Sequence, residues 1–253
     1  MNRIFNIALA ASAALLAGFF LLLTAGLLLT LIETAPAAAV STPRIFSILR
    51  VSLVSATVSA SLATGLGIPT AYLLSRKNFF GKTALDTLLD LPLVLSPVAV
   101  GAMLLIFFST GFGRRLDEIF GPFVLSPRGI IIAQFVIVVS LAVRLLKAAF
   151  DGVDVEYENI SRTLGLGPAA TMLRVVLPIS RRGVLAAFLL VWGRALGEFG
   201  ATVTLVGATP FRTETAATAI HLSLESGDLA GGLFFVAVLL AVSMTILYLV
   251  RKI

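Results

Sequence analysis

The stretch EYENISRTLGLGPAATMLRVVLPISRR, residues 156–182, is a basic, polar segment that lies between two long apolar segments. A loop that only connects two membrane spans needs few residues, whereas this one carries signals for two short helices. Gly165 suits the left-handed position that follows a helix end, and Pro168 suits the first turn of a second helix. Pro178 marks the end of that second helix. The stretch therefore predicts a helix over 155–164, a break and a second helix, which together contact something in the aqueous phase.

The composition of the chain indicates a membrane protein. Apolar residues make up 58% of the 253 residues, charged residues 13%, and the mean hydropathy is +1.06. A soluble core of this length could not cover so much apolar surface with polar residues. The net charge of +6 lies at the edges of the apolar segments and not in one patch, so the predicted partner is the lipid bilayer and not nucleic acid. Cysteine is absent, which excludes disulfides and thiol chemistry.

Six apolar segments are long enough to cross a bilayer, which takes about 20 residues. They cover residues 4–32, 48–74, 84–109, 129–150, 183–206 and 229–250. The first exceeds the apolar region of a cleaved signal peptide, which is only about 7–15 residues long, and is therefore expected to be a retained anchor. The sequence predicts an all-α polytopic protein with six transmembrane helices. Residues 1–44 form an N-terminal helix with its outer loop, and residues 45–250 form the core.

The distribution of Lys and Arg predicts how the protein is oriented, because cytoplasmic loops carry an excess of both. With the N-terminus in the cytoplasm, the inner side holds twelve of the 19 basic residues and the outer side six, while Arg194 lies within a span. A multi-pass protein of the cell membrane is expected. Both termini and the polar stretch 156–182 then face the cytoplasm.

The spacing within the polar stretch resembles the cytoplasmic coupling loop of bacterial and archaeal ABC importer permeases. That family pattern reads Glu-Ala-Ala, three residues, Gly, and later a hydrophobic residue, any residue, Leu and Pro. The family glycine falls on Gly165, the proline on Pro178 and the glutamate on Asn159, whereas the nearest carboxylate, Glu158, is one place early. An ordinary amphipathic loop resting on lipid headgroups is the alternative.

The resemblance implies that a short helix docks in a groove of a separate ATPase subunit. The residues that it assigns to this contact are Asn159, Ile160, Ser161, Arg162, Thr163, Leu164 and Gly165, with Pro178 closing the motif. The chain itself has no Gly-x-x-x-x-Gly-Lys-Ser/Thr phosphate loop. ATP and Mg²⁺ are therefore expected to be used by the partner, no cofactor is expected on this chain, and it is not predicted to be an enzyme.

The fifth apolar segment carries small residues and two charges. Gly193 and Gly197 are spaced as Gly-x-x-x-Gly with Gly200 nearby, a pattern that permits close helix packing. Arg194 and Glu198 lie deep in the span, where ionisable residues usually mark a functional site. At a spacing of four residues they could equally form a structural pair that neutralises itself.

Three further stretches resemble permeases for molybdate, tungstate and, in variant form, sulfate. They are LGEFGA at 196–201, GIPTAY at 67–72 and DLPLVLSPVAVG at 90–101, and the likeness covers roughly residues 48–250. Prolines within a span free backbone carbonyls and often break the helix beside a substrate path. The candidate pathway and packing residues are Pro92, Pro97, Gly193, Arg194, Gly197, Glu198, Gly200 and Thr202.

The resemblance implies a symmetric homodimer that associates with two ATP-binding cassette subunits and an extracytoplasmic oxyanion-binding protein, and that imports molybdate or tungstate by alternating access. Sulfate or another anion of the same family is the alternative. A stand-alone secondary transporter would carry its own coupling carboxylates and usually a repeated half, and only Glu198 is present. No catalytic residue or metal site is predicted. His221, the single histidine, has no second His or Cys and is expected to be a solvated loop residue.

Overall fold

The computed structural model of the protein describes residues 2–34 and 41–252, and every regular element in these ranges is a helix. Four helices are long and apolar enough to cross a membrane: α1 (Asn2–Thr34), α2 (Thr42–Arg76), α6 (Pro127–Asp151) and α13 (Leu229–Lys252). Two bent pairs raise the number of candidate spans to six. The predicted all-α fold is confirmed in the described residues.

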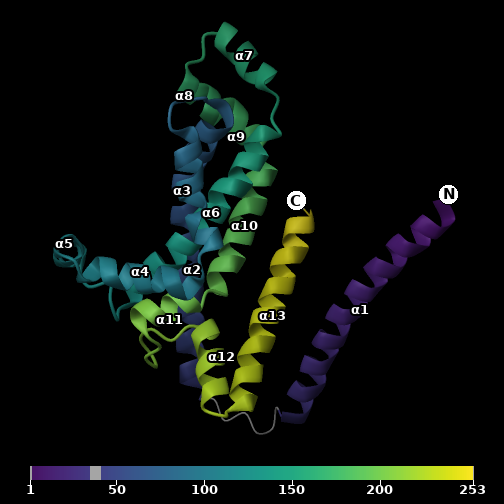
Figure 1. The fold of residues 1–253 in the computed structure, drawn as a ribbon, viewed down its shortest axis with the longest axis vertical. Helices are drawn as coiled ribbons and strands as arrows, with labels where there is room; N and C mark the ends of the chain where they lie inside the picture. Colours follow the sequence, from purple (N-terminus) through teal and green to yellow (C-terminus); the bar gives the residue numbers. More distant parts are fainter. Residues whose placement is uncertain (1, 35–40, 253) are drawn as a thin grey trace.

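The centre of the molecule is a bundle of α2, α6 and α10 (Arg181–Leu196), which run side by side in Figure 1. Ala56, Ala60 and Ala63 recur on one face of α2 and are fully buried against α6 and α10. Small side chains at this spacing let the backbones approach closely, because packing and not water exclusion drives helix association in lipid. At Gly67 an added Cβ would lie 2.9 Å from the Leu146 side chain of α6.

The third predicted span, 84–109, is a broken one, in keeping with the two prolines that it contains. The chain forms α3 (Lys82–Val94) and α4 (Pro97–Ser109), which meet at an angle of 112°. Pro97 cannot donate a backbone hydrogen bond, and the Ser96 side chain instead accepts one from the amide of Ala99 and starts a new helix. In Figure 1, α3 runs with the bundle, whereas α4 and the following α5 (Gly111–Phe120) extend to one side.

The fifth predicted span, 183–206, is also interrupted. Helix α10 ends at Leu196, Gly197 forms its C-cap, and a separate helix α11 (Gly200–Val206) follows and packs on α4. On its other side, α10 meets the helical segment 168–179 at an angle of 77°. The apolar pattern did not reveal the break between α10 and α11, because both halves of this segment are apolar.

The helices at the two ends of the chain, α1 and α13, lie together on one side of the bundle (Figure 1). Helix α1 packs against α13, and no residue of its most apolar window is buried. Helix α12 (Ala216–Glu225) precedes α13. Figure 1 shows both chain ends pointing toward the end of the molecule that carries α7 (Val155–Thr163). The start of α1, the end of α13 and helix α7 therefore point the same way along the molecule.

Candidate functional site: an exposed loop helix and a membrane cavity

The first half of the polar stretch forms the predicted helix. Helix α7 begins after Asp154, whose side chain accepts a hydrogen bond from the amide of Glu156 at 2.9 Å. It ends one residue before Leu164, and Gly165 follows with a φ of +86°. This left-handed turn lets the amide of Leu166 reach the carbonyl of Ser161 at 3.0 Å. The break predicted at Gly165 is confirmed.

The second half differs from the prediction at Pro178. Helix α8 (Pro168–Thr171) starts at the predicted proline and passes into a π-helical turn (Met172–Val176) and α9 (Leu177–Ile179). Pro178 therefore lies inside helical backbone and does not end it. The wider π turn loosens the hydrogen-bond ladder just before the proline, which has no amide to contribute. The segment ends at Ser180, where α10 begins in a new direction.

Helix α7 has polar residues on its buried side and apolar residues in solvent. Glu158 and Ser161 are almost completely buried, whereas Tyr157, Ile160 and Leu164 are 54%, 55% and 77% exposed. These three residues are spaced as i, i+3 and i+7 and so share one face, hereafter the apolar stripe. A helix that served only to pack on its own chain would bury such a stripe. The arrangement leaves an apolar surface open to a partner.

The sequence did not reveal the role of Glu158. Its carboxylate accepts hydrogen bonds from Arg76 Nε at 2.5 Å and from the Tyr72 hydroxyl at 2.7 Å, both on α2. Arg162 Nη2 lies 3.5 Å away. The spacing of Tyr72 and Arg76, one turn apart at the end of α2, was the available signal. Glu158 therefore faces into the chain and is not presented to the aqueous phase.

Three of the candidate pathway residues meet around one cavity. Pro92 of α3, Pro97 of α4 and Arg194 of α10 line a space of about 140 Å³. Its remaining lining is apolar and comes from Leu93, Leu95, Ile137 and Leu141. The break in the third segment thus lies beside Arg194, the one basic residue within the fifth predicted span.

Arg194 and Glu198 form an ion pair, with Arg194 Nη1 2.7 Å from Glu198 Oε2. The other carboxylate oxygen accepts a hydrogen bond from the amide of Ala201 at 3.1 Å, in the first turn of α11. Glu198 is 1% exposed, whereas the Arg194 side chain is 41% exposed. The acid is thus held by two partners across the gap between α10 and α11, and the base borders the cavity.

Within the single chain, the glycines of the fifth segment contact different elements. Gly193 faces Ile246 of α13, and Gly200 packs on Pro97, where an added Cβ would lie 2.9 Å away. Around Gly197 the nearest such atom is the carbonyl oxygen of Gly193, 3.9 Å away. Thr202 is fully buried, and its hydroxyl has no hydrogen-bond partner among the described residues.

Gly101 on α4 is a close-packing position that the sequence did not single out. An added Cβ there would lie 2.7 Å from Thr204 Cβ and 2.9 Å from the Ala201 backbone of α11. We expect Gly101→Val to destabilise the contact between α4 and α11 by about 1–3 kcal/mol, the usual cost of overpacking. Gly197→Ala is the control, since its added Cβ would make only an ordinary van der Waals contact, 3.9 Å from the carbonyl oxygen of Gly193. Thermal unfolding of the purified protein in detergent measures both, and equal midpoints would contradict the assignment.

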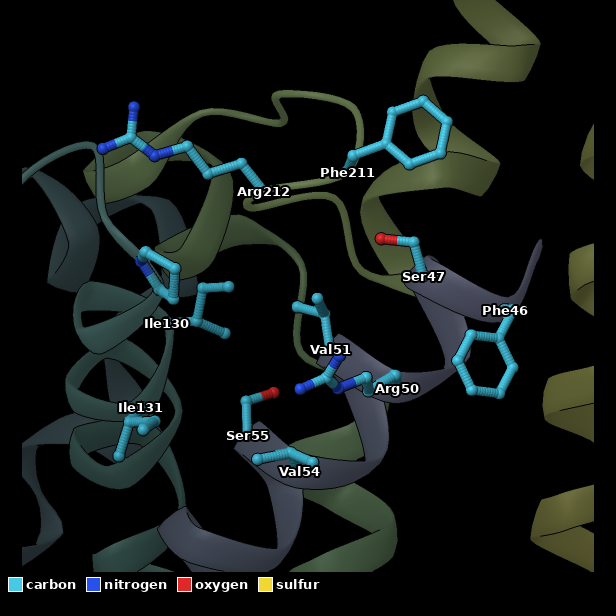
Figure 2. Close-up of a pocket in the computed structure, with 11 residues that line it drawn as sticks. Phe46, Ser47, Arg50, Val51, Val54, Ser55, Ile130, Ile131, Phe211 and Arg212 are labelled. Atoms are coloured by element: carbon cyan, nitrogen blue, oxygen red, sulfur yellow. The ribbon is translucent and has the colours of Figure 1, made fainter. Parts of the chain in front are cut away.

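The largest cavity described lies at the end of the bundle opposite α7. It has a volume of about 430 Å³ and is bordered by α2, the start of α6 and the loop that carries Phe211 and Arg212. Figure 2 shows the guanidinium of Arg50 pointing toward Ser55, whereas the side chain of Arg212 extends away from it. The two cations do not converge on one point, so their positions do not form an anion clamp.

His221 differs from its predicted place in a solvated loop. It lies on α12, its ring stands 4.4 Å from that of Phe199, and its Nε2 lies 3.0 Å from a carboxylate oxygen of Glu225. The described residues contain no group of three or more His, Cys, Asp or Glu side chains that could hold a metal ion.

A helical membrane bundle with an exposed helix–break–helix at one end is the architecture of an ABC importer permease. The chain belongs to the family described as "Binding-protein-dependent transport system inner membrane component", which it matches over residues 63–253. As a member of that family it is a multi-pass component of the inner membrane and not itself a catalyst.

Two relatives that match this chain are named as permeases for molybdenum and for sulfate. The chain is 39% identical over 178 residues to the "Molybdenum transport system permease protein ModB" of Escherichia coli K12, covering 69% of this chain and 78% of that protein. It is 29% identical over 211 residues to the "Sulfate transport system permease protein CysT" of Salmonella typhimurium, covering 83% and 76%.

Solved structures share the fold. A bacterial ABC transporter involved in the import of the acidic polysaccharide alginate has a chain that superposes with a TM-score of 0.74, at 16% identity, over 100% of this chain and 98% of its own. At that identity the likeness supports the helical architecture alone.

Proposed function

We propose that the chain is the permease subunit of an ATP-driven importer for molybdate or tungstate. The substrate assignment is supported by the identity to ModB and by 33% identity over 159 residues to the "Molybdate/tungstate transport system permease protein WtpB" of Pyrococcus abyssi, which covers 63% of this chain and 60% of that protein. The sulfate permease relative is less similar, at 29%. Sulfate is therefore the second candidate substrate.

The observation that carries the transport mechanism is the exposed apolar stripe of α7. Tyr157, Ile160 and Leu164 lie in solvent on a helix whose other side is fixed to the chain by Glu158. Such a surface suits the groove of an ATPase subunit. In the proposed complex, residues 159–165 dock there and ATP binding moves the two coupling helices together.

The proposed complex contains two copies of this chain, two ATP-binding cassette subunits and an extracytoplasmic oxyanion-binding protein. ATP and Mg²⁺ are held by the ATPase pair, and this chain binds no cofactor. Both termini and α7 face the cytoplasm. Residues 1–44 provide an additional membrane helix with its outer loop, and residues 45–250 form the permease core.

The proposed pathway passes the cavity that Pro92, Pro97 and Arg194 line. Glu198 neutralises Arg194, so a divalent anion meets a cation whose attraction is already partly satisfied. Such an anion is guided but not held, as transport requires. Gly193, Gly197, Gly200 and Thr202 contribute packing beside this pathway.

The test is uptake into proteoliposomes that contain the chain, its ATPase and its binding protein. Molybdate, tungstate and sulfate are offered separately at equal concentration. We expect ATP-dependent uptake of molybdate and tungstate that disappears when the binding protein is omitted. Sulfate uptake that equals or exceeds both would reassign the substrate, and uptake without ATP would indicate a secondary transporter.

A further inference from the structure

The attachment of α7 to the rest of the chain is polar and concentrated at few points. On its buried side, Glu158 bonds to α2, and the Ser161 hydroxyl lies 2.9 Å from that of Thr171 on α8. Its apolar residues face away from the chain. Helix α7 also packs on α8 and the π turn, and the hydrogen bonds of Glu158 are its side-chain connection to α2.

Glu158, Tyr72 and Arg76, hereafter the Glu158 cluster, form the contact with α2. Arg76 binds the loop twice, since its Nε lies 2.5 Å from Glu158 and its Nη2 donates to the carbonyl of Val153 at 2.6 Å. The Arg76 side chain is 9% exposed and Glu158 is 1% exposed. One arginine thus holds both the start and the middle of α7 in a site from which water is largely excluded. Hydrogen bonds between charged groups are strong and directional in such surroundings.

The position of the cluster connects α7 to a helix that runs the full length of the bundle. Tyr72 and Arg76 occupy the last two turns of α2, whose Ala56, Ala60 and Ala63 pack in the central core. Leu74, which lies between Tyr72 and Arg76 on α2, is buried with Phe150 of α6 and Val176 of the π turn. A displacement of α7 therefore meets a packed, continuous element and not a flexible connection.

We propose that the Glu158 cluster is a mechanical joint that transmits the movement of α7 to α2. The proposal rests on the proposed function of α7 as the helix that docks to the ATPase. Coupling between distant sites needs a physical connection of this kind, in which both sites bias one element. Glu158 is then a positioning residue that acts within the chain and does not itself contact the ATPase.

The test replaces the ion pair between Arg76 and Glu158 with two cysteines that can be cross-linked reversibly. The chain has no cysteine, so Arg76→Cys with Glu158→Cys gives it only two thiols. The variant is reconstituted with its ATPase and binding protein, and molybdate uptake and ATP hydrolysis are measured together. Without a linker, we expect the ATPase to bind and hydrolyse ATP while uptake per ATP falls by about tenfold, within the usual range of coupling factors. A short reducible bifunctional thiol reagent should restore uptake, and reduction should abolish it again.

Two further variants distinguish the loss of the Glu158 cluster from a general effect of substitution at this end of the bundle. Tyr72→Phe removes one hydroxyl from the cluster and should lower uptake per ATP less than the cysteine pair does. Lys82→Met removes an exposed hydrogen bond to Asn78 at the same end of the bundle and should leave uptake per ATP unchanged.

Unchanged uptake per ATP in the unlinked cysteine variant would overturn the proposal. Loss of ATPase binding that the linker does not repair would also overturn it, because the cluster would then only shape the docking surface. Failure of the proposed function is distinguishable, since the unmodified chain itself would then bind no ATPase or take up no oxyanion.

Discussion

Replacing Ile160 and Leu164 together with glutamate is expected to abolish binding of the ATPase subunit and, with it, ATP-driven uptake. Both side chains belong to the apolar stripe and are more than half exposed in the chain alone. Burying each against a partner is worth about 1.5–3 kcal/mol, so losing both weakens binding by roughly 100-fold or more. Co-purification of the ATPase with the tagged permease measures the effect, with uptake as the second readout.

The matched control is Phe80→Glu. Phe80 is a fully exposed aromatic residue in the loop between α2 and α3, at the same end of the bundle but outside the stripe. It should leave ATPase binding intact. Equal losses in both variants would mean that any added acid at this end repels the partner. Normal binding in the double glutamate variant would remove α7 as the docking element.

Removing Arg194 alone is expected to destabilise the protein more than removing it together with its partner. Arg194→Met leaves the buried Glu198 carboxylate with the amide of Ala201 as its remaining bond, and an orphaned buried charge costs about 3–5 kcal/mol. Glu198→Gln keeps an acceptor for that amide and leaves an arginine that is already 41% exposed, so its cost is smaller. The double variant should recover most of the loss. Thermal unfolding in detergent ranks the three proteins.

Uptake by the double variant then tests whether the pair is structural. We expect transport to be retained, because the ion pair neutralises itself and leaves little attraction for a passing anion. Collapse of uptake in a double variant that still assembles with its ATPase would make Arg194 a residue that contacts the anion.

The sequence predicted the features that depend on local chemistry. Gly165 required a left-handed turn, and the structure has one. The polar stretch was recognisable because Gly165, Pro168 and Pro178 are typical of helix starts and ends. A loop that only connects two spans does not need such signals. The Arg194–Glu198 pair followed from a spacing of four residues on a helix.

The features that depend on contacts between distant segments could not be predicted in the same way. The separation of α10 from α11 occurs within apolar sequence that contains no proline, where a bend and a straight span have the same composition. Glu158 looked like a misplaced family residue because its partners on α2 lie more than 80 positions earlier. Gly101 gave no signal because its neighbour Thr204 belongs to a helix far along the chain.

The outward-facing apolar stripe also has a consequence for how the protein is produced. A chain synthesised without its ATPase leaves Tyr157, Ile160 and Leu164 exposed at the membrane surface. Such patches attract chaperones, proteases and other unfolded chains. We expect the yield of intact permease to rise when both genes are expressed together, because the ATPase then covers the stripe.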